Sequence, residues 1–157
     1  MSNTTVTEEG KEALRASLQR HQTFQQDAQN VLAWTANLRG LVATLQNLIR
    51  AVGGQTHLGV DMLRFSAIIS NQAGRMETIL QQMRVTFTSI NTYRTLVLLH
   101  NLLRVPVGEE IPNLEETWPV LGLVNTFDNL TSELNTLWLG SMAYEQQVEQ
   151  YSQLARS

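Results

Sequence analysis

The 157-residue sequence contains no cysteine, and this absence removes several classes of protein at once. A disulfide scaffold, a zinc site built on thiolates and a cysteine nucleophile all need that residue. Long apolar runs are missing too, since none exceeds Leu96–Leu99 and a membrane-spanning helix needs roughly 18 residues. The opening MSNTTVTEEGKE lacks the basic and apolar regions of a signal peptide. The sequence therefore favours an intracellular location or a place within an assembled particle.

Proline is scarce, and the three prolines gather in one segment between residues 105 and 119. Elsewhere, apolar residues recur at alternating steps of three and four, which is typical of the seam of a coiled-coil helix. We predict an all-α fold, an elongated antiparallel three-helix coiled-coil bundle that forms a single domain over 1–157. The predicted elements are helix 7–52, helix 58–104, connector 105–117 and helix 118–155. This layout resembles that of spectrin-type repeats in architecture alone.

Polar residues interrupt the seams at a few positions. Thr35 and Gln72 lie on them and Gln146 lies close by, so we expect a polar layer that fixes the register of the helices. The seam of the second helix continues through Tyr93 and Val97.

The stretch TLVLLHNLLRVPV, residues 95–107, is apolar in almost every helical direction, so other residues must cover it. An antiparallel register brings it near a second such stretch, WPVLGLV, residues 118–124. The apolar side chains of these two stretches are either buried within the chain or exposed. If they are exposed, they form a contact surface for a partner, because exposed apolar patches mark association sites. The candidate contact residues at this end are Leu98, Leu99, Leu102, Trp118 and Leu121. Trp138 and Leu139 form a second candidate contact.

Charge is distributed unevenly along the chain, whose net charge is −3. Residues 28–108 carry seven arginines against Asp61 and Glu77, whereas residues 109–157 carry eight acidic residues against Arg156. Centring the second turn near Glu110 predicts four pairs between helices: Arg104 with Glu116, Arg94 with Asp128, Arg84 with Glu133, and Arg75 with Glu145. The alternative is that these arginines face an anion such as a nucleic-acid backbone.

Residues for catalysis or metal binding do not cluster in the sequence. His21, His57 and His100 fall at different heights of the predicted bundle and lack a metal-ligand spacing, so we interpret each as a seam or turn residue. No glycine-rich loop precedes a helix to hold phosphate. We therefore expect no enzymatic activity, no cofactor, no metal and no small-molecule substrate.

These patterns favour a structural module that self-associates or docks on a protein partner, as a subunit of a filament, virion or injection apparatus. Two alternatives stay open. One is a membrane-active helical bundle whose apolar end opens and binds lipid, and the other is a helical coat protein that binds nucleic acid through the arginines of the second helix.

Overall fold

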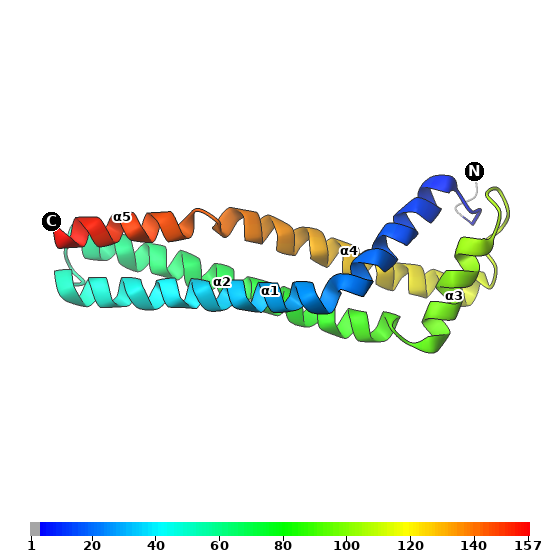
Figure 1. Ribbon diagram of the computed structural model, residues 1–157, viewed down its shortest axis with the longest axis horizontal. Coiled ribbons are helices and arrows are strands. Elements are labelled where there is room, and N and C mark those ends of the chain that lie inside the picture. Colours follow the sequence, from blue (N-terminus) through cyan, green and yellow to red (C-terminus); the bar gives the residue numbers. More distant parts are fainter. Residues whose placement is uncertain (1–3) are drawn as a thin grey trace. The chain divides into compact units, whose positions relative to one another are not determined.

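The computed structural model describes residues 4–157, and helices make up 86% of the structure. In this part of the chain the elements are α1 (Glu8–Val52), α2 (His57–Ile90), α3 (Tyr93–Arg104), α4 (Leu114–Ser141) and α5 (Tyr144–Arg156), shown in Figure 1. The predicted all-α class is confirmed. The prediction of three unbroken helices is wrong, because the second and the third are each divided in two.

The first predicted helix is the most accurate of the three. It begins where the Thr7 hydroxyl accepts the Gly10 N–H, which satisfies one of the free donors at a helix N-terminus. It ends before Gly53, whose φ of 93° is left-handed and whose N–H donates to the Ile49 carbonyl. These two caps explain why α1 keeps the length that the sequence predicts.

The break between α2 and α3 falls at Asn91–Thr92. Thr92 is extended, with φ −94° and ψ 152°, and its side chain accepts the Thr95 N–H as the N-cap of α3. The break changes the helical phase, so the predicted seam fails beyond Ile90. Tyr93 and Val97 of that seam are exposed, whereas Leu99, predicted as a contact residue, is fully buried.

The break between α4 and α5 falls at Met142–Ala143, beside a group of polar side chains. Gln72 of α2 donates from Nε2 to the Leu137 carbonyl in the last turn of α4. The Ser141 hydroxyl in turn donates to the Trp138 carbonyl. The predicted polar layer is therefore present at Gln72, but Gln146 is exposed and Thr35 bonds only to its own helix.

The connector is shorter than predicted, because α4 begins at Leu114 and not at residue 118. Asn113 takes a left-handed φ of 50°, and its carbonyl accepts the N–H groups of Glu116 and Thr117. The buried Thr117 hydroxyl donates to the Pro112 carbonyl. These bonds, with Glu115 and Glu116 in the first turn, stabilise a helix start that places Pro119 inside the helix.

The chain divides into two compact units. Unit 1 comprises the chain up to Asp27 together with Gln81–Ser132, and unit 2 comprises Ala28–Leu80 together with Glu133–Ser157. Helices α1, α2 and α4 each contribute residues to both units. The predicted single domain over 1–157 stays a prediction.

Within unit 2, three helical segments lie side by side, from α1, from α2 and from α4 with α5 (Figure 1). Trp34 of α1 packs on Trp138 of α4 with ring centroids 5.2 Å apart, and Phe65 of α2 contacts Tyr144 and Tyr151 of α5. The fully buried side chains of this unit include Leu38, Leu45, Met62, Ile69 and Met76. Neighbouring segments in unit 2 thus share an apolar core.

Candidate functional site

The apolar stretch 95–107 is covered in part by the chain itself. Leu99 and Leu102 are buried and Leu98 is half-buried, all within unit 1. On α4, Leu121 is half-buried and Trp118 is 54% exposed. The predicted contact residues at this end therefore include a buried set and an exposed indole.

The N-terminal segment supplies much of the cover, which the sequence did not reveal. Residues Thr4–Val6 run antiparallel to the connector Gly108–Ile111, and the main chains form three hydrogen bonds: Val6 N–H to the Glu109 oxygen at 2.8 Å, Gly108 N–H to the Val6 oxygen at 2.8 Å, and Ile111 N–H to the Thr4 oxygen at 2.7 Å. The pairing buries the Val6 side chain over the end of α3. The β-branched run TTVT was the only signal in the sequence that pointed to an extended segment.

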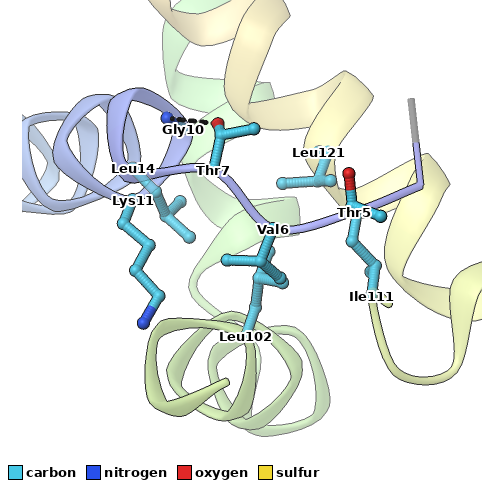
Figure 2. Close-up of a pocket in the computed structure, with 9 residues that line it drawn as sticks. All are labelled: Thr5, Val6, Thr7, Gly10, Lys11, Leu14, Leu102, Ile111 and Leu121. Carbon is cyan, nitrogen blue, oxygen red and sulfur yellow. Dashed lines mark hydrogen bonds between the residues drawn. The ribbon is translucent and has the colours of Figure 1, made fainter. Parts of the chain in front are cut away.

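An apolar pocket remains where these pieces meet. It has a volume of about 110 Å³ and is open to solvent, and its walls come from Val6, Leu14 of α1, Leu102 of α3, Ile111 of the connector and Leu121 of α4. Figure 2 shows Val6 between Leu102 and Leu121. Lys11, the single lysine, lines one side, and in this view its ammonium is directed away from Leu121. Two of the predicted contact residues, Leu102 and Leu121, thus form walls of the pocket.

The second predicted contact lies in unit 2. Trp138 is half-buried against Trp34, whose indole Nε1 donates to the Ser141 hydroxyl at 2.7 Å. Leu139, the next residue along α4, is 67% exposed. Only Leu139 of this pair is therefore available for a partner.

The ion pairs join different residues from those predicted. Arg75 pairs with Glu133 at 3.3 Å and Arg94 with Glu116 at 3.1 Å, so each arginine meets an acidic residue about three helical turns earlier than predicted. Asp128 pairs with Arg20 at 2.8 Å. Among residues 4–157, no ion pair involves Arg84, Arg104 or Glu145.

The connector accounts for part of the register error. A turn centred near Glu110 assumes that residues 105–117 form a symmetric bend. In the structure this segment leaves the helices after Arg104 to pair with Thr4–Val6, and α4 begins four residues early. A fourth pair, Arg39 with Glu77 at 2.6 Å, lies between α1 and α2 and was not predicted.

A site for a metal ion or for a membrane requires other features of the chain. Within residues 4–157, no three side chains of the types His, Cys, Asp and Glu come close enough to hold a metal ion. No helix in the same range has the length and apolar character needed to cross a membrane. Comparison of the chain with protein-family models, with curated proteins and with solved structures finds no match.

Proposed function

We propose that this chain is a non-enzymatic interaction module that docks on protein, either a second copy of itself or another chain, as part of a larger assembly. The observation that carries this proposal is the solvent-open apolar pocket of unit 1, walled by Val6, Leu14, Leu102, Ile111 and Leu121. The occupant that we propose is an apolar side chain of the partner.

The size of the pocket supports an occupant of this kind. An engineered apolar cavity of about 150 Å³ holds a benzene molecule, so about 110 Å³ suits an aliphatic side chain. Filling an apolar hollow that faces water is favourable, because it removes apolar surface from solvent. Two of the five segments that form the pocket walls, Thr4–Val6 and the connector, are joined by main-chain hydrogen bonds. This part of the pocket is therefore ordered before a partner binds, which lowers the entropic cost of binding.

An exposed indole next to the pocket also supports docking. Trp118 lies one helical turn before Leu121 on α4, and tryptophan is among the residues that contribute most to binding energy at protein interfaces. We propose that Trp118 packs on the partner beside the residue that enters the pocket.

Sedimentation velocity over a range of concentrations tests docking on a second copy. We expect the wild-type chain to form oligomers and Leu121→Glu, which charges a pocket wall, to sediment as a monomer with its helical circular dichroism unchanged. Leu63→Glu is the matched control, because Leu63 is 56% exposed on α2 in unit 2. An equal loss of oligomers in Leu121→Glu and Leu63→Glu would argue for a general effect of surface charge and against docking at the pocket.

A wild-type chain that stays monomeric at every concentration excludes the second copy as occupant. The same three proteins are then used as baits in a pull-down. A partner retained by wild type and by Leu63→Glu, but released by Leu121→Glu, is the expected result. A partner retained equally by all three would overturn the assignment to the pocket.

The elongated, antiparallel three-helix coiled coil stays part of this proposal as the finer description of the fold. In this description α2 and α3 together form one long interrupted helix, and α4 and α5 together form another. Small-angle scattering of the monomer tests it, and an extended particle is the expected result.

A further inference from the structure

A buried histidine lies at the centre of unit 1. His21 of α1 is 8% exposed, and its ring stacks on Phe87 of α2, with centroids 5.0 Å apart and planes 13° apart. The ring of Phe127 of α4 also contacts the imidazole, with centroids 4.2 Å apart and planes 35° apart. The imidazole Nε2 is buried and has no hydrogen-bond partner among residues 4–157.

The charged and titratable groups around this ring are few. From α1 there is Arg20, and from α4 there is Asp128, whose carboxylate already accepts hydrogen bonds from Arg20 and from the Ser17 hydroxyl. From α3, His100 lines a cavity of about 390 Å³ that His21 also lines. From α2, the residues at this cavity are Phe87 and Asn91, and neither of them titrates.

We propose that His21 is an acid-sensitive switch, and that protonating its imidazole loosens the packing of the first half of α1, up to Asp27, on Phe87 and Phe127. Leu14 lies on this half of α1, so the loosening also displaces a wall of the apolar pocket.

The geometry around the ring explains why charge is unfavourable there. An imidazolium has two N–H donors, and the buried Nε2–H would have no acceptor. The phenyl faces attract a cation, but they do not replace the hydration that burial removes. Burial lowers the pKa of His21, Asp128 opposes this by raising it, and Arg20 lowers it further.

The sign of the pH dependence follows from proton linkage. The pKa of the histidine is about 6.5 in the unfolded chain and lower in the folded chain. Above pH 6.5 the contribution of the neutral ring is fully present. As the pH falls from 6.5 towards the folded pKa, the unfolded chain holds more protons, and the unfolding equilibrium constant rises by up to about tenfold per pH unit.

Urea unfolding of the full chain at several values between pH 7.5 and pH 5 tests the proposal. We expect the midpoint for wild type to fall in this range more steeply than that for His21→Phe, which keeps an aromatic ring and cannot titrate. His100→Gln is the control at the same cavity, since His100 is exposed and its Nδ1 lies 2.8 Å from the Leu96 oxygen. Equal slopes for wild type and His21→Phe, or a loss of the slope in His100→Gln, would overturn the proposal.

Two measurements on the wild-type chain keep the proposal testable if His21→Phe does not fold. The sequence has three histidines, so three imidazole signals can be titrated by NMR and assigned with His57→Gln and His100→Gln. The remaining signal should titrate below pH 6.5, and titration at or above that value would refute the switch. Hydrogen exchange should show protection falling at acid pH at Leu14–Phe24 more than at Ile69–Leu80, and a uniform fall would refute the localised loosening.

Discussion

Polar groups inside unit 2 are paired with one another, whereas unit 1 buries an imidazole whose Nε2 has no partner within residues 4–157. In unit 2 the Gln72 amide, the Trp34 indole and the Ser141 hydroxyl all form hydrogen bonds across or along the helices, and none of them titrates near neutral pH. Unit 1 also contains both the apolar pocket and the cavity beside His21. The unpartnered imidazole and the two hollows described above thus lie in the same unit, and such departures from ideal packing are where functional sites are expected.

The aromatic cluster of unit 1 offers the largest expected effect. Phe127 is 1% exposed and contacts both His21 and Phe24, so Phe127→Ala should lower the free energy of unfolding by about 3–5 kcal/mol. Trp138→Ala in unit 2 should cost less, because Trp138 is half-buried. Urea unfolding followed by circular dichroism measures both, and an equal or larger loss for Trp138→Ala would contradict this ranking.

The turn between α1 and α2 in unit 2 should tolerate change poorly. A Cβ on Gly59 would clash with the Gly53 carbonyl oxygen, so Gly59→Ala must move the backbone and should destabilise the chain by about 3 kcal/mol. Gly40 on α1 has nothing within 4 Å of such an atom, and Gly40→Ala should stabilise by up to about 1 kcal/mol. Thermal unfolding of the two variants should therefore shift in opposite directions, and shifts of the same sign would show that the turn is looser than its geometry implies.

The paired amide of unit 2 gives the third expected effect. Gln72→Met keeps the volume but removes the hydrogen bond to the Leu137 carbonyl, and losing one such bond should cost about 0.5–1.5 kcal/mol. The loss should be independent of pH between 5 and 7.5, in contrast to the effect expected from His21. Urea midpoints measured at pH 5 and pH 7.5 check this. A loss of stability confined to acid pH would mean that the polar groups of the two units do not differ in their pH dependence.

The smallest expected effect concerns the exposed pair of Arg75 and Glu133 in unit 2. Solvent screens such pairs, so Arg75→Ala should change the free energy of unfolding by about 0.2–1 kcal/mol. Arg75→Glu should cost slightly more and should be partly rescued by Glu133→Arg in the double variant. An additive double variant, measured by the same urea titration, would mean that the two charges do not interact in solution.

The helical class and the ends of α1 could be predicted from the sequence, because they depend on local periodicity and on the caps at Thr7 and Gly53. The two helix breaks could not. The break before α3 depends on Thr92 competing for a backbone N–H, and the break after Ser141 lies beside the hydrogen bond from Gln72 to a helix distant in sequence. Neither break can be recognised from the spacing of apolar residues in the sequence.

The candidate site was predictable only in part. An apolar surplus at Leu99, Leu102 and Leu121 was evident from composition, but which of these residues would be buried depended on the phase change after Ile90. The walls formed by Val6 and Ile111 could not be predicted, since their segments are distant in sequence and pair through backbone atoms. The predicted ion pairs were wrong because all of them depended on one assumed turn, and an error in that turn shifts every partner along α4.

The pairing of Thr4–Val6 with Gly108–Ile111 also bears on how the chain is made. The Thr4 hydroxyl and the Glu110 carboxylate form a hydrogen bond across 106 positions of the sequence. During synthesis Thr4–Val6 therefore has no segment to pair with until Ile111 has emerged from the ribosome. Val6 and Leu14 are exposed throughout that interval, and closing so large a loop is slow compared with forming the helices. The nascent chain thus passes through a stage in which Val6 and Leu14 lack their cover, and at this stage a chaperone or a protease can reach them.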